Sequence, residues 1–128
     1  MSSPSQEEIY ESYLQVKMLG LKNLKLKDLP DGDKILQISG TGVGTIHTVD
    51  NSTPQGQRDP FAKNVVYGYG GRGTLPLYNG IYCYLPLSYL DEEYVFKALL
   101  SGTYEDLAMH LGSLHASILR KVSEVSDQ

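Results

Sequence analysis

Apolar residues near the start of the chain recur every three or four positions, which is the period of an α-helix. Ser5 and Glu8, just ahead of them, have the spacing of a capping box, in which each side chain accepts a hydrogen bond from the other residue's backbone amide. The pattern predicts a helix over residues 6–19. It also predicts a flexible tail over residues 1–5.

Between residues 24 and 86 the pattern changes to short β-rich segments separated by glycine, proline and asparagine. Residues 24–27 alternate apolar side chains with lysine, as a half-exposed strand does. Residues 34–50 predict either two strands around a glycine-rich bend or one long kinked strand. Residues 50–64 are polar and predict a long loop of the functional or mobile kind, after which a further strand begins at Val65.

The pair Asn79-Gly80 is the clearest local signal, because between β-rich runs it favours a hairpin with a two-residue turn. In that register Leu77 pairs with Tyr82, and Pro76 pairs with Cys83. Both faces of the hairpin then carry apolar or aromatic side chains and no charge. A small domain has little material to cover both faces, so we expect a second subunit or another protein to cover one of them.

Two helices are predicted after the hairpin. The segments Ser88–Asp91 and Thr103–Asp106 have capping-box spacing, and Ser101-Gly102 separates the two helices. Apolar residues of the second helix fall seven apart, which indicates a packed helix face. They are Tyr104, Leu111, Ile118 and Val125.

The order of these elements predicts an α+β fold: an N-terminal helix, a central and mostly antiparallel sheet, and two C-terminal helices packed on that sheet. The sheet is expected to be open or curved toward a barrel. Parallel crossovers are not expected, because helices do not alternate with strands.

Composition places the chain among globular proteins, with 128 residues, 41% hydrophobic and 20% charged. This length suits a single domain over residues 1–128. The net charge of −4 argues against a polyanion bound over the whole surface. The charge is unevenly divided, however, because residues 34–90 hold four basic against two acidic residues, and residues 91–128 hold three against seven.

The sequence predicts a cytoplasmic protein, or one of the host cytoplasm or virion if it is viral. It shows neither a signal peptide nor an apolar run near the ~18 residues that span a bilayer, so membrane insertion is not expected. Cys83 is the only cysteine, which excludes an internal disulfide and favours a packed thiol. His110 and His115 are five apart and point in different directions from a helix, so they are not expected to bind one metal ion together. No cofactor-binding loop has the required spacing either, so no cofactor is expected.

Catalysis receives little support. His47, Asp50, Arg58 and Asp59 could form an acid–base group, but their spacing fixes no geometry. A strand-end histidine beside a solvated loop is the simpler interpretation, and no catalytic residue is predicted.

We first expect a non-enzymatic protein that assembles with copies of itself or binds another protein. A viral or phage structural or accessory protein is compatible with this hypothesis. The predicted contact residues lie on the hairpin and on the last helix: Tyr78, Ile81, Tyr82, Tyr84, Leu85, Leu111, Leu114 and Ile118.

The alternative hypothesis is a small module that binds single-stranded nucleic acid. It rests on tyrosines for stacking, on glycines that can present backbone amides, and on cations for phosphate. The predicted contact residues are Tyr67, Tyr69, Arg72, Arg58 and Lys63.

Overall fold

The computed structural model describes residues 5–126, apart from the side chains of Arg72 and of residues 124–126. The predicted tail therefore lies outside the described residues, except for Ser5. In chain order the elements are α1 (Gln6–Met18), η1 (Leu26–Asp28), β1 (Lys34–Ser39), β2 (Ile46–Asp50), η2 (Gln55–Gln57), β3 (Val65–Tyr67), η3 (Gly70–Thr74), β4 (Cys83–Pro86), η4 (Leu87–Tyr89), α2 (Glu92–Ser101) and α3 (Tyr104–Ser126), where η marks a 3-10 turn.

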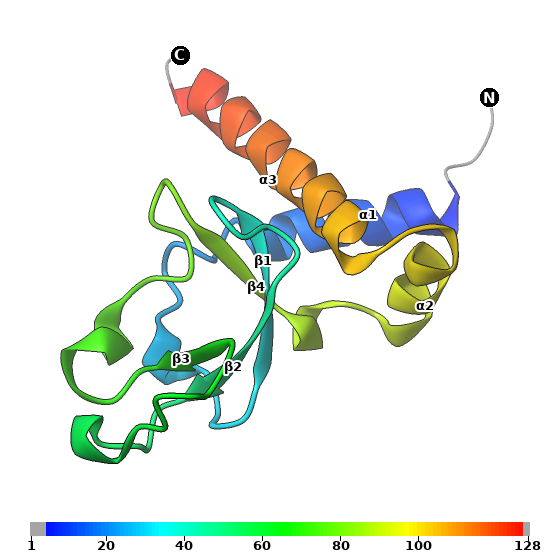
Figure 1. Ribbon diagram of the computed structural model, residues 1–128. Coiled ribbons are helices and arrows are strands. Elements are labelled where there is room, and N and C mark those ends of the chain that lie inside the picture. Colours follow the sequence, from blue (N-terminus) through cyan, green and yellow to red (C-terminus); the bar gives the residue numbers. More distant parts are fainter. Residues whose placement is uncertain (1–4, 127–128) are drawn as a thin grey trace.

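The strands form a four-stranded sheet in the order β3-β2-β1-β4, and the helices precede and follow it (Figure 1). The α+β prediction is confirmed. Strand β1 pairs antiparallel with both β2 and β4, so the sheet is mostly antiparallel, and it is not closed into a barrel.

The expectation of no parallel pair was wrong, because β2 and β3 run parallel. A parallel pair needs a connection of about a dozen residues or more, but that connection need not be a helix. Residues 51–64 return the chain with only the short turn η2 between the two strands. The predicted long loop is thus the crossover itself.

Residues 34–50 form two strands rather than one kinked strand. The glycine-rich bend between them packs against the start of α3: a Cβ added at Gly44 would lie 2.7 Å from Cα of Glu105. Only glycine fits at such a distance, and Gly44 also has a φ of +95°.

The hairpin forms at Asn79-Gly80, but its predicted register was wrong. Tyr78 pairs with Cys83 across a four-residue loop, instead of with Ile81. The two-residue turn favoured by this pair needs positive φ at both positions, and only Gly80 has it. The side chain of Asn79 instead accepts hydrogen bonds from the amides of Ile81 and Tyr82, at 3.0 and 2.8 Å.

The strand predicted over residues 24–27 does not form as a strand. Lys25 and Pro76 form a single bridge, and the chain then turns into η1. The amide of Leu77 donates to the carbonyl of Leu24 at 2.9 Å, while the amide of Tyr84 donates to the carbonyl of Leu77 at 2.8 Å. The segment around Leu77 therefore joins β4 to the N-terminal part of the chain, beyond the regular ladder.

The cap predictions were right for two helices of three. The hydroxyl of Ser5 accepts the amide of Glu8 at 3.1 Å, and Thr103 and Asp106 cap α3 reciprocally. Helix α2 begins later than expected. Asp91, not Ser88, caps it, by accepting the amide of Glu93 at 2.8 Å.

Helices α1 and α3 cross over one side of the sheet, whereas α2 lies at its end (Figure 1). Strand β1 is buried from Ile35 to Ile38, so both of its faces are covered. No helix of the described residues is long and apolar enough to span a membrane. The fully buried side chains of the core include Leu14, Met18, Leu21, Ile35, Leu36, Cys83, Leu85 and Leu111.

Candidate functional site

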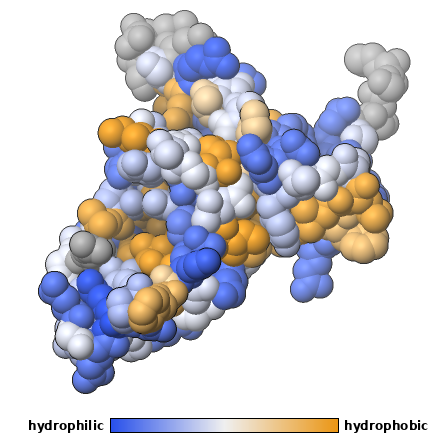
Figure 2. All heavy atoms as spheres, in the orientation of Figure 1, coloured by the Kyte–Doolittle hydropathy of each residue, from blue (hydrophilic) through white to orange (hydrophobic). Residues whose placement is uncertain are grey.

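Helix α2 is the element whose apolar residues find least cover. Six of its ten residues are apolar or aromatic, yet none is buried. Phe96 and Leu100, one turn apart, are 64% and 73% exposed. Figure 2 shows the hydrophobic surface that gathers over this helix. A helix of this composition is normally covered on most sides, so α2 has the character of a contact surface.

A groove runs beside α2 and encloses about 560 Å³. Phe96 stands at its edge, between the exposed face of the helix and the groove. Side chains from η4, α2 and the start of α3 make the apolar part of its wall: Leu87, Leu90, Val95, Leu99 and Tyr104. We call this groove, together with Phe96 and Leu100, the α2 patch.

The border of the α2 patch is acidic. Asp91, Glu92 and Glu93 form the first turn of α2 and are exposed, as the positive end of a helix dipole favours. Lys97 offsets part of this charge through an exposed ion pair with Glu93 at 3.5 Å. The other wall of the groove carries one charge of each sign, Asp33 and Lys34, so the negative charge is concentrated at the first turn of α2.

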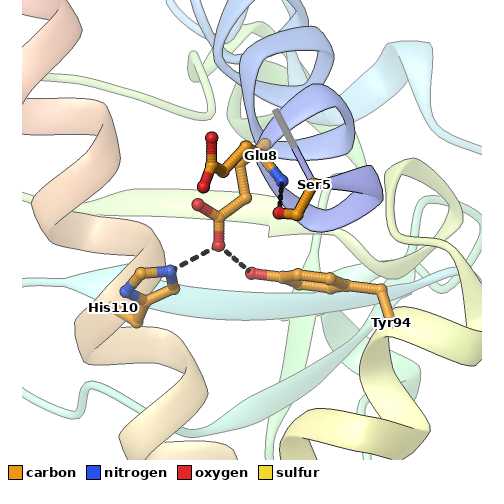
Figure 3. Close-up of polar contacts among 5 residues, drawn as sticks. Ser5, Glu8, Tyr94 and His110 are labelled. Carbon is orange, nitrogen blue, oxygen red and sulfur yellow. Dashed lines mark hydrogen bonds and ion pairs between the residues drawn. The ribbon is translucent and has the colours of Figure 1, made fainter. Parts of the chain in front are cut away.

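A polar junction holds α2 in place. Tyr94 from α2 and His110 from α3 point toward one carboxylate, that of Glu11 on α1 (Figure 3). The hydroxyl of Tyr94 donates to Glu11 Oε1 at 3.0 Å, and Nε2 of His110 lies 2.8 Å from the same oxygen. Three helices thus meet at one oxygen atom.

Tyr94 acts here as a neutral donor. Burial and the neighbouring Glu11 carboxylate raise the pKa of its hydroxyl far above the usual range. Its ring also packs on Tyr10, with the ring centroids 4.8 Å apart. The cavity beside the junction is about 340 Å³. A histidine–carboxylate pair can transfer protons in principle. Here, however, the contacts of His110 and Glu11 link helices α1, α2 and α3 to one another.

The far end of α3 is a second uncovered surface. Figure 1 shows this helix running past the sheet. Exposure along its apolar stripe rises accordingly: Leu111 is buried, and Ile118 is half-exposed. Arg120 and Lys121 lie next to this stripe and are exposed. Up to residue 123, the end of α3 therefore carries partly exposed apolar side chains beside two cations, and the side chain of Glu124 lies outside the described residues.

The residues predicted to contact a partner differ in how far the structure buries them. Leu85 and Leu111 are fully buried in the chain's own core and offer no surface to a partner. Tyr78, Tyr84, Leu114 and Ile118 are half-buried, and only Ile81 and Tyr82, in the hairpin loop, are exposed. The chain therefore covers most of the hairpin itself, contrary to the reasoning from its two apolar faces.

The predicted nucleic-acid residues are partly brought together. Arg58 and Tyr69 line one pocket with Gln55, Gly70 and Gly71, and Arg58 also stacks on Tyr67. Lys63 is exposed in the connection before β3. The side chain of Arg72 lies outside the described residues.

The considered acid–base group is not assembled. Nε2 of His47 lies 3.1 Å from the amide oxygen of Gln37, and burial lowers the pKa of the imidazole. The carboxylate of Asp50 instead accepts hydrogen bonds from Ser52 and Thr53. Within the described part of the chain, no cluster of three or more histidine, cysteine, aspartate or glutamate side chains could hold a metal ion.

Comparison of the chain with protein-family models, with curated proteins and with solved structures finds no match. Its function is therefore inferred from its own surface. Sequence reasoning missed Phe96 and Leu100. Their signal was the run Tyr94–Leu100, in which Lys97 is the only charged residue and which therefore leaves no polar face for solvent.

Proposed function

We propose that this chain is a non-enzymatic, self-assembling protein whose α2 patch binds a second copy of the same chain. The observation that carries the proposal is the exposure of Phe96 and Leu100 on a helix that has no buried residue. Burying one such side chain contributes about 1.5–3 kcal/mol, so a contact that covers both has a substantial driving force.

Charge complementarity favours the end of α3 of the second copy as the surface that contacts the α2 patch. An α2 patch placed against another α2 patch would offer the acidic first turn little positive charge, because the one cation of α2, Lys97, already pairs with Glu93. The end of α3 offers half-buried Ile118 and Leu119 beside the exposed Arg120 and Lys121, which suit an apolar centre with acidic side chains next to it. The second copy is thus the proposed partner because the chain itself carries the matching surface.

A contact between two different surfaces is heterologous. Each copy then retains one unused surface, and assembly continues until a ring closes or a filament forms. This proposal predicts species larger than a dimer at high concentration.

The mass of the native protein in solution tests the proposed self-assembly. Multi-angle light scattering across a concentration series should show masses above 14.2 kDa for the wild-type chain. Phe96→Ser with Leu100→Ser should shift the series toward the monomer. Phe61→Ser is the matched control, because Phe61 is 87% exposed but lies in the connection between β2 and β3.

The loss of two apolar contacts of this size corresponds to at least about tenfold weaker association. A wild-type chain that stays at 14.2 kDa throughout would contradict self-assembly. Equal weakening by Phe61→Ser would contradict the assignment to α2.

A further inference from the structure

We propose that the pocket between η2 and η3 binds single-stranded nucleic acid, with Arg58 on a phosphate and Tyr69 against a base. The pocket encloses about 480 Å³ and is lined by Gln55, Arg58, Tyr69, Gly70 and Gly71. The chain segments on either side of β3, which form this pocket, lie at the opposite end of the molecule from α2 (Figure 1). This inference is therefore independent of the proposed assembly.

Arg58 contacts an aromatic ring and makes no ion pair among the described residues. Its guanidinium carbon lies 4.7 Å from the centre of the Tyr67 ring, so the aromatic face fixes the plane of the guanidinium group. Among the described residues no carboxylate lies within ion-pair distance of it. Its Nε is buried and has no hydrogen-bond partner in the described part of the chain. A guanidinium group that makes no ion pair and lines a pocket suits a phosphate oxygen, which would be bound by its terminal nitrogens rather than by the buried Nε.

The opposite wall supplies a stacking face and open backbone. Tyr69 is 50% exposed. Gly70 and Gly71 are exposed, and a Cβ added at either would meet no described atom within 4 Å other than those of its chain neighbours. A base can stack on the Tyr69 ring while the backbone of the same nucleotide passes the glycines. Tyr67 has a different role from the one predicted, because its ring supports Arg58.

The positive charge is local. Lys63, on the same connection between β2 and β3, adds a second cation, and the exposed Asp59 of this connection offsets part of the charge, whereas the acidic α2 lies at the other end of the fold. Two cations imply about two phosphate contacts. Binding should therefore be modest and depend weakly on salt, with the dissociation constant rising about sevenfold from roughly 50 to 200 mM salt.

Fluorescence anisotropy with labelled thymidine and uridine homopolymers of about 15 nucleotides tests the proposal. We expect binding at micromolar protein concentrations in low salt. Arg58→Ala should abolish it, and Tyr69→Ala should weaken it about fivefold or more. Lys22→Ala is the matched control: it also removes one exposed positive charge, but on the turn that follows α1, and should leave affinity unchanged.

The outcomes separate clearly. Binding that is lost in Arg58→Ala, weakened in Tyr69→Ala and unchanged in Lys22→Ala supports the site. Circular dichroism confirms that each variant is folded. No binding of either homopolymer, or equal weakening by Lys22→Ala, overturns it. Competition by inorganic phosphate or a mononucleotide as strong as by the homopolymer also overturns it, because the ligand would then be a free anion rather than a strand.

Discussion

Gly112 of α3 lies against the carbonyl of Ile38 at the centre of the sheet, so closely that a Cβ added to the glycine would overlap that oxygen. The separation between α3 and β1 is therefore set by the absence of a side chain. This contact positions the start of α3 over the core and leaves its far end projecting.

Gly112→Ala should destabilise the fold. Alanine favours a helix by about 1 kcal/mol over glycine, but the clash is with a backbone carbonyl and requires α3 to move from the sheet, at a cost of about 2–3 kcal/mol. We expect a net loss of about 1–2 kcal/mol in the free energy of unfolding, measured by urea denaturation. Gly56→Ala is the control, since a Cβ there meets no atom within 4 Å. A Gly112→Ala protein as stable as the wild type would refute the close contact.

Cys83 should be unreactive in the native protein. It is fully buried, and burial raises the pKa of its thiol to about 12, so the thiolate that reacts is scarcely present. A thiol reagent at mildly alkaline pH should label the unfolded chain within minutes and the native chain only at the rate of unfolding. Rapid labelling without denaturant would place Cys83 at the surface.

Stability should fall on mild acidification. His115 is 5% exposed and lies edge-on to the ring of Tyr78, and burial lowers the pKa of its imidazole below 6.5. Between the folded and the unfolded pKa the unfolded chain binds more protons, so stability is full above pH 6.5 and is lost as the pH falls through that interval. The half-buried His47 adds to the effect in the same direction.

His115→Gln should reduce this pH dependence. The measurement is the free energy of unfolding at about pH 7 and about pH 5 for the wild type and the variant. The difference between the two pH values should be smaller in the variant. An unchanged difference would show that His115 does not carry the effect.

Charge reversal should reveal which surfaces meet. Glu92→Lys alters the margin of the α2 patch, and Lys121→Glu alters the end of α3. Each variant alone should assemble more weakly, because the contact now holds like charges. Mixing the two variants should restore assembly, since the lysine introduced on α2 of one copy then faces the glutamate introduced on α3 of the other. Mixed variants that remain as weak as the separate ones would contradict a head-to-tail contact.

Structural features that depend on residues close together in the sequence could be predicted. The caps at Ser5 and Thr103 depend on residues three positions apart, and both form as predicted. The hairpin at Asn79 was found for the same reason, but its register depends on whether the asparagine uses its backbone or its side chain, which the sequence pattern does not fix.

Burial was less predictable because it depends on distant partners. Leu85 appeared to need an external cover, yet the chain buries it completely. Phe96 appeared to be an ordinary helix residue, yet nothing in the described part of the chain covers it fully. Arg58 and Tyr69 share a pocket because the parallel crossover brings the connection over residues 51–64 back to β3, and a parallel pair was not expected.

The central claim is that α2 becomes covered when two copies of the chain meet. Amide hydrogen exchange at several protein concentrations tests it most directly. The amides of α2 and of the far end of α3 should become more protected as the concentration rises, while those of β3 and η3 stay constant. Exchange in α2 that is identical at every concentration would contradict the claim.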